Sequence, residues 1–390
     1  MRVKGLDTSQ QFYLFFHFPH FMARREWCKP NCGNCNTFSQ RRSFFFSFFY
    51  RIEHIYHFLL MELSLPLALL AIAGGLWLLT FGGNILVDGA VSIAKRFKIS
   101  QAIIGLTIVA IGTSLPELIV SVTASLQGNT EIAIANVTGS NIANIFLILG
   151  LSALIAPVMI SKTARRFDIP FVILTTLLLL LMTSDKLIDG AGSNFLSRID
   201  GIILLSVAIA YILYSIKHHS FDHQDEELIE ASYSLGKTLI WIGGGIVALL
   251  IGGKLLVDGA VTVATSFGLS ETIIGLTIVA VGTSAPELAT SIIAARKWNS
   301  DIALSNVVGS NIMNILIILG VSSAIAPLPF LESGVRDVLI GLMAPIMILI
   351  LGYLGRSHLT KHHTLTRIGG GVLVSIYIVF LVMLILQEIA

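Results

Sequence analysis

The sequence predicts an all-α membrane protein with ten transmembrane helices arranged as two inverted five-helix repeats. Its 390 residues are 55% hydrophobic and 12% charged, and the mean hydropathy of +0.84 lies outside the range of soluble globular proteins. Ten apolar stretches are long enough to cross a bilayer. Residues 86–157 also reappear without a gap as residues 256–327, with 43 of the 72 aligned pairs identical.

The ten stretches follow one another with short polar connections, and the first and sixth are unusually long. This length predicts helices that are steeply tilted or that project beyond the membrane. The expected spans are 64–94, 101–125, 131–156, 167–184, 199–216, 236–264, 271–295, 301–327, 335–354 and 367–387.

Three regions follow from this pattern. Residues 1–60 combine phenylalanine clusters with eight basic residues, unlike the rest of the chain, and we expect a non-native or disordered extension with translation starting at Met61. Their three cysteines lack a convincing fourth ligand for a zinc site. Residues 61–220 form the first predicted repeat and residues 235–390 form the second, inverted repeat.

Basic residues in the loops set the predicted orientation, because cytoplasmic loops carry an excess of Lys and Arg. One side has only Lys186, Arg198 and Arg336, counted from Met61. The other side has Lys95, Arg96, Lys98, Lys162, Arg165, Arg166, Lys217, Lys237, Arg296, Lys297, Arg356, Lys361 and Arg367. Both termini are therefore expected outside the cytoplasm.

Inversion follows because five spans is an odd number. Lys95, Arg96 and Lys98 of the first copy are replaced by uncharged residues in the second. Conversely, Leu126 and Gln127 of the first copy become Arg296 and Lys297. Positive charge thus moves to whichever loop faces the cytoplasm. Inverted repeats are common in secondary transporters, which bind ions near the midplane where the repeats meet.

Each repeat carries a glutamate directly after a proline inside an apolar span. Pro116 and Pro286 should bend or break their helices and free carbonyl groups there. Glu117 and Glu287 have no basic residue in their own helices, and an intramembrane acid costs roughly 2.5 to 3.5 kcal/mol on insertion scales. Beside them lie the hydroxyls of Thr113, Ser114, Thr283 and Ser284. This oxygen-rich, doubly anionic group favours a hard cation such as Ca²⁺ or Na⁺.

The third and eighth spans supply further oxygen atoms. Ser140 and Asn144, like Ser310 and Asn314, are four residues apart and share a helical face, from which they could complete the coordination. Asn141 and Asn311 could equally bridge helices by hydrogen bonds, and the glycines could serve helix packing.

Two further acids, Asp88 and Asp258, occupy matched positions in the two long spans. Lys254 lies four residues before Asp258, which favours a local ion pair there. Asp88 has no such neighbour, and its role is left open.

The blocks GLTIVAIGTSLPE and GLTIVAVGTSAPE, followed by NVTGSNIANI and NVVGSNIMNI, resemble the paired alpha repeats of the calcium/cation antiporter superfamily, in particular its prokaryotic sodium/calcium exchangers. The resemblance covers residues 61–390. It implies ten helices with both termini outside, and ion binding by Glu117 and Glu287. It also implies that these are helped by Thr113, Ser114, Thr283, Ser284, Ser140, Asn144 and Ser310. One departure is Asn314, where many sodium/calcium exchangers have aspartate.

The predicted function is antiport of Ca²⁺ against Na⁺ by alternating access at one midplane site. A Ca²⁺/H⁺ exchanger is the nearest alternative, and a cation channel is a second. An enzyme is not expected, because the spans show no catalytic constellation. We expect no cofactor, no nucleic acid and no obligate protein partner, only the lipid bilayer and the transported ions, among which H⁺ or K⁺ is possible. The expected location is the plasma membrane, or the inner membrane of a Gram-negative cell.

Overall fold

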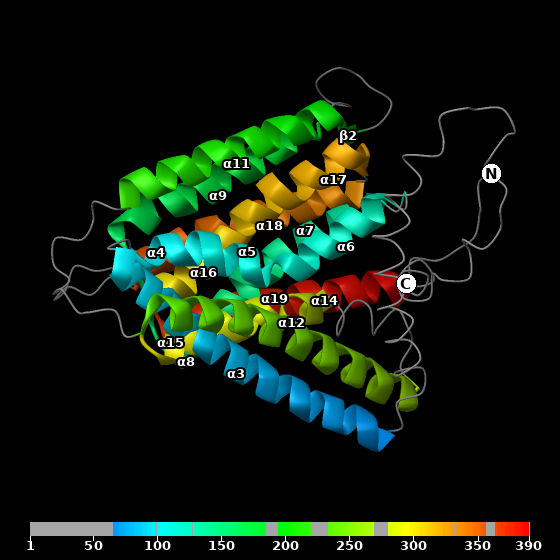
Figure 1. Ribbon diagram of the computed structural model, residues 1–390. Helices are drawn as coiled ribbons and strands as arrows, with labels where there is room; N and C mark the ends of the chain where they lie inside the picture. The colour runs from blue at the N-terminus through cyan, green and yellow to red at the C-terminus, as the bar shows by residue number, and fades with distance from the viewer. Residues whose placement is uncertain are drawn as a thin grey trace, which may run out of the picture.

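The computed structural model describes residues 65–97, 100–126, 128, 130–184, 194–219, 233–268, 280–330, 332–355 and 363–389. The predicted extension, residues 1–60, lies outside these described residues. What is described is almost entirely helical, and Figure 1 shows the helices gathered into a bundle.

The first half contains one long helix, a broken helix and three further helical stretches. Its elements are α3 (Leu65–Phe97), α4 (Gln101–Ile104), η2 (Gly105–Val109), α5 (Ala110–Thr113), α6 (Leu115–Leu126), α7 (Thr130–Ala143), η3 (Asn144–Leu149), α8 (Gly150–Ile155), η4 (Ala164–Asp168), α9 (Ile169–Met182) and α11 (Arg198–His219). The labels η2, η3 and η4 denote π-helical turns, which are wider than α-helical ones.

The second half repeats this order. Its elements are α12 (Leu235–Ser266), α14 (Ala280–Thr283), α15 (Ala285–Arg296), α16 (Ser300–Met313), η6 (Asn314–Leu319), α17 (Gly320–Ile325), α18 (Glu332–Leu354) and α19 (Arg367–Ile389). The prediction of two unusually long helices is confirmed, because α3 has 33 residues and α12 has 32.

Seven described helices are long and apolar enough to cross a membrane, or eight if the bent pair formed by residues 101–113 and 115–126 is one span. The protein is therefore a multi-pass membrane protein. Two of the ten predicted spans are not among these. α9 has only 14 residues, and the stretch 271–295 lies partly outside the described residues.

Two short antiparallel strand pairs, which the apolar pattern of the sequence did not indicate, join the halves. β1 (Val158–Ile160) pairs with β4 (His363–Leu365), and β2 (Asn194–Leu196) pairs with β3 (Leu328–Phe330). In each pair, a strand that follows a buried helix of one half meets a strand that precedes the last long helix of the other half. The four strands thus repeat the internal symmetry of the chain.

The long helices α3 and α12 pack against each other in antiparallel directions. A Cβ atom on Gly75 would lie 2.8 Å from the backbone oxygen of Gly252, and one on Gly82 would lie 2.9 Å from that of Gly245. Residue numbers rise along one helix as they fall along the other, which defines the antiparallel packing. Only residues without a side chain permit so close an approach. Figure 1 shows this pair at one edge of the bundle, with α9 and α11 at the opposite edge.

The core lies along α7–α8 and α16–α17. In an apolar stretch of 18 residues from each of these two spans, 78% and 94% of the residues are buried. The corresponding share is 22% for α3 and for α19. Ile145, Phe146 and Leu316 are among the buried core residues, whereas Trp77 and Leu386 are exposed. Apolar side chains on the outer helices can face lipid. Polar groups of a binding site at membrane depth must instead be surrounded by protein, so the inner helices are the ones that can carry such a site.

Candidate functional site

Both proline-containing helices break where the sequence predicted. The axes of the segments 101–113 and 115–126 differ by 50°, and α15 likewise begins one residue after Ser284. Ser114 and Ser284 have matching, nearly identical backbone angles at the two breaks. Glu117 and Glu287 then fall in the first turn of α6 and of α15. The unpaired amide groups and the dipole at a helix N-terminus favour negative charge.

The two glutamates are completely buried and are linked across the halves. Each has 0% exposure. Ser114 Oγ donates to Glu287 Oε1 at 2.8 Å, and Ser284 Oγ donates to Glu117 Oε1 at 3.1 Å. The hydroxyl at the break of each half therefore binds the carboxylate of the other half, which brings both acids into one site.

Several buried oxygen atoms at this site have no hydrogen-bond partner within the part of the chain that the structure describes. They are Glu117 Oε2, Glu287 Oε2, Asn144 Oδ1, Asn314 Oδ1 and Ser310 Oγ. No Lys or Arg of that part forms an ion pair with either glutamate. Buried polar groups normally find partners, and a buried carboxylate without one is costly. Five such oxygens are a donor set suited to a hard cation.

Ser140 in α7 joins the two breaks. Its hydroxyl donates to Glu117 Oε1 at 3.4 Å and lies 3.0 Å from Ser284 Oγ. The matched Ser310 in α16 makes no such contact, since its hydroxyl is without a partner among the described residues. The site is therefore symmetric in composition and asymmetric in its hydrogen bonds.

Four asparagines, two in the span formed by α7 and η3 and two in the span formed by α16 and η6, form a reciprocal network. Asn141 Nδ2 donates to Asn311 O at 3.2 Å, and Asn311 Nδ2 donates to Asn141 O at 3.1 Å. Asn144 Nδ2 donates to Asn311 Oδ1 at 3.0 Å, and Asn314 Nδ2 donates to Asn141 Oδ1 at 2.9 Å. Asn141 and Asn311 thus bridge helices, which resolves the alternatives left open by the sequence. They also accept hydrogen bonds from the amide groups of Asn144 and Asn314, whose side-chain oxygens have no partner among the described residues.

Asn144 and Asn314 each begin a π-helical segment, η3 and η6. Single π-helical turns are frequent at functional sites, because the wider turn re-aims side chains. Nothing in the hydropathy pattern indicated these turns, although their positions match between the halves.

Asn136 and Asn306 support the helices that carry the glutamates. Asn136 Nδ2 donates to the backbone oxygen of Glu117 at 3.1 Å, and Asn306 Nδ2 lies 3.5 Å from that of Glu287. Thr113 Oγ1 donates to Asn306 Oδ1 at 3.3 Å, which ties Thr113 to this support. Thr283, the last residue of α14, is half-buried.

The acids of the two long helices, Asp88 and Asp258, are both ion-paired. Lys254 Nζ lies 3.0 Å from Asp258 Oδ2, as the spacing in the sequence predicted. Asp88 pairs with Lys297, whose Nζ lies 2.7 Å from Asp88 Oδ1. This second partner, 209 residues away, was not predicted.

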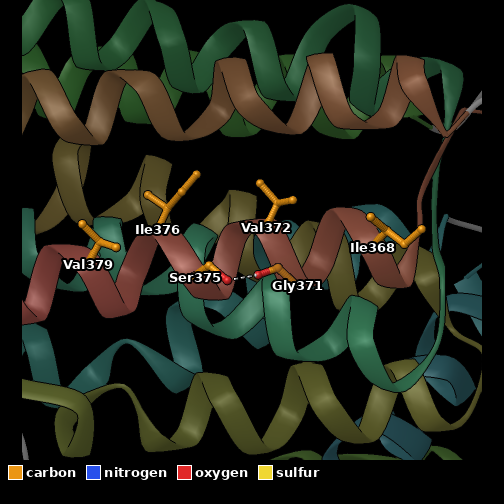
Figure 2. Close-up of a pocket in the computed structure, with 6 residues that line it drawn as sticks. All are labelled: Ile368, Gly371, Val372, Ser375, Ile376 and Val379. Carbon is orange, nitrogen blue, oxygen red and sulfur yellow. Dashed lines mark hydrogen bonds between the residues drawn. The ribbon is translucent and has the colours of Figure 1, made fainter.

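An apolar groove on α19 is a poor candidate for ion binding. Figure 2 shows its lining by Ile368, Gly371, Val372, Ser375, Ile376 and Val379. The only side-chain oxygen there belongs to Ser375, which donates to the backbone oxygen of Gly371 at 2.9 Å. Such a surface suits lipid contact rather than a cation.

A multi-pass helical fold around a buried, acidic oxygen site is typical of membrane proteins that transport cations. Comparison with known proteins identifies its family, because the family described as sodium/calcium exchanger protein matches residues 67–217 and 237–386. The chain belongs to the sodium/calcium exchanger family, and it is a transporter of the antiporter type rather than an enzyme.

Individual relatives agree with this assignment. The chain is 40% identical over 313 residues to the putative antiporter CaxA of Alkalimonas amylolytica, covering 78% of this chain and 94% of that protein. It is 31% identical to the sodium/calcium exchanger MaX1 of Methanosarcina acetivorans, covering 80% and 96%. A solved structure of the sodium-calcium exchanger NCX_Mj matches with a TM-score of 0.70 and 31% identity, covering 82% of this chain and all of that one.

Proposed function

We propose that the protein exchanges Ca²⁺ for Na⁺ by alternating access at one site that contains Glu117 and Glu287. The observation that carries the proposal is the pair of fully buried carboxylates, each with an oxygen that lacks a partner among the described residues. The proposed ion ligands are Thr113, Ser114, Glu117, Ser140, Asn144, Thr283, Ser284, Glu287, Ser310 and Asn314.

Charge balance accounts for the exchange of these two ions. Two glutamates give the site a formal charge of −2, which one Ca²⁺ neutralises. Sodium ions that bind the same oxygens provide the same charge and occupy the same space, so they exclude Ca²⁺. Two bare carboxylates resist transfer through an apolar barrier, because an intramembrane acid costs roughly 2.5 to 3.5 kcal/mol. Only an occupied site can therefore pass between the two states, which couples the two fluxes.

The architecture we propose has ten spans in two inverted repeats, residues 61–220 and 235–390, with both termini outside the cytoplasm of a plasma membrane. The antiparallel packing of α3 and α12 and the reciprocal Ser114–Glu287 and Ser284–Glu117 contacts support it. The loop charges support the orientation. In an inverted repeat, the two long helices can move relative to the buried helices and open the site to either side in turn.

A Ca²⁺/H⁺ exchanger is the alternative that the same glutamates favour, because protons compete with metal ions for carboxylates. A cation channel is less well supported, since channels commonly build rings of acidic side chains from several subunits.

Flux of ⁴⁵Ca²⁺ into proteoliposomes that contain the purified protein separates these possibilities. An outward Na⁺ gradient should drive uptake, and replacing Na⁺ by choline at equal pH should abolish it. Uptake driven by a pH gradient in sodium-free buffer would favour proton exchange. Uptake that is indifferent to the opposing ion gradient would indicate a channel and contradict antiport.

A further inference from the structure

A lysine at the end of α15 is bound to the long helix α3 by an ion pair and a hydrogen bond. Lys297 Nζ lies 2.7 Å from Asp88 Oδ1 and donates to the backbone oxygen of Asn84 at 3.2 Å. Lys297 directly follows α15, the helix that carries Glu287. Both partners are partly buried, with side-chain exposures of 28% for Lys297 and 37% for Asp88. The ion pair therefore joins one of the two long helices to a helix of the candidate site.

The other half of the protein cannot form this pair. Asp258 in α12 matches Asp88, but its partner is Lys254 on the same helix, at 3.0 Å. The position in the first half that matches Lys297 is Gln127, which carries no charge. The Lys297–Asp88 pair thus connects two helices that are distant in sequence, whereas the Lys254–Asp258 pair lies within a single helix.

The two long helices also pack unequally on the rest of the protein. The closer packing is again between α3 and α15. A Cβ atom on Gly83 of α3 would collide with Ile293 of α15. The matched Gly253 of α12 faces Pro286, at 3.6 Å, and not α6. Across the described residues, α3 packs along α15, whereas α12 has no comparable packing on α6. The Lys297–Asp88 pair lies at the end of the one contact that is formed.

We propose that the Lys297–Asp88 pair is a latch that stabilises the state in which α3 packs on α15, and that the opposite transport state has no equivalent. The inference rests on the proposed alternating access. In an inverted-repeat transporter, the second state arises when the two halves exchange arrangements. That exchange would bring α12 against α6, where Asp258 would meet Gln127 instead of a lysine. The latched state is therefore favoured by one ion pair. The loop charges place the end of α15 on the cytoplasmic side, so the latched state is the one closed to the cytoplasm.

The equilibrium between the two states can be measured through calcium binding on each side. The apparent affinity at one face is proportional to the fraction of molecules open to that face. The ratio of the two apparent affinities, measured in vesicles of opposite orientation, therefore follows the equilibrium constant directly. In Lys297→Gln, the apparent affinity at the face that bears the end of α15 should rise about two- to fivefold relative to that at the other face. This is the range expected for the loss of a partly exposed ion pair.

Two variants serve as matched controls. Lys254→Gln removes the ion pair within α12 and should leave the ratio as in the wild type. Exchanging the charges, Asp88→Lys together with Lys297→Asp, should restore the ratio that Lys297→Gln shifts. An unshifted ratio in Lys297→Gln, with calcium exchange intact, would overturn the latch. Failure of the wild type to exchange calcium would instead count against the proposed function.

A measurement without transport tests the latch independently. Hydrogen–deuterium exchange on the purified protein should be faster in Lys297→Gln than in the wild type over residues 86–97, because α3 separates from α15 more often. The charge-exchanged double variant should recover the wild-type rates, and Lys254→Gln should not change them. Equal rates in Lys297→Gln and the wild type would show that the pair does not hold α3.

Discussion

Replacing Glu287 by glutamine should weaken calcium binding by about 60- to 300-fold. Glu287 and Glu117 are both fully buried, and no basic residue of the described chain balances them. In the variant, a bound Ca²⁺ leaves one uncompensated positive charge. A charge at that depth costs roughly 2.5 to 3.5 kcal/mol, and about 1.4 kcal/mol corresponds to a tenfold change in affinity. The fold should survive, because Ser114 can donate to the amide oxygen as it does to Glu287 Oε1.

Equilibrium binding of ⁴⁵Ca²⁺ to the purified protein in sodium-free detergent solution measures this loss. The control is Asp258→Asn, which removes an acid that is already paired with Lys254 on its own helix. It should bind Ca²⁺ within about twofold of the wild type. The reasoning is refuted if Glu287→Gln, eluting as a folded monodisperse protein, binds Ca²⁺ within about threefold of the wild type.

Three further predictions follow from the packing and the asparagine network. Gly82→Leu should destabilise the protein by about 1 to 3 kcal/mol, because the new side chain forces α3 away from α12. Nothing lies within 4 Å of a Cβ atom on Gly74, so Gly74→Leu should leave the melting temperature in detergent unchanged. Asn311→Ala should cost about 1 to 3 kcal/mol in the same assay, because the buried amide of Asn144 loses its acceptor; an unchanged melting temperature would contradict this. Asn314→Asp adds a third acid to the site, so the Hill coefficient for sodium displacement of Ca²⁺ should rise by about one, and an unchanged coefficient would exclude Asn314 from the site.

Features that depend on a single span were accessible from the sequence. Glu117 and Glu287 were identified as site residues because an acid in an apolar span is costly, and the structure buries both. Pro116 indicated a helix break because proline cannot complete the hydrogen bonding of a helix, and a 50° bend lies beside it. The exceptional lengths of α3 and α12 could be read from uninterrupted hydropathy.

Features that depend on contacts between distant segments were not accessible. Lys297 stands in a loop by its sequence, and nothing local indicates that it reaches Asp88 on another helix. The π-helical turns begin at Asn144 and Asn314, and the apolar residues that follow carry no local signal for a π-helix. The internal symmetry also suggested equal roles for Ser140 and Ser310, but within the described residues Ser140 contacts a glutamate and Ser310 does not, because the two halves are packed differently.

Sodium-driven uptake of ⁴⁵Ca²⁺ by proteoliposomes containing the wild type, Glu117→Gln or Glu287→Gln tests the central claim most directly. That claim is that calcium and sodium compete for one site built on both carboxylates. The account predicts rapid uptake by the wild type and none by either variant, at equal protein incorporation. Uptake at the wild-type rate by both variants would contradict it.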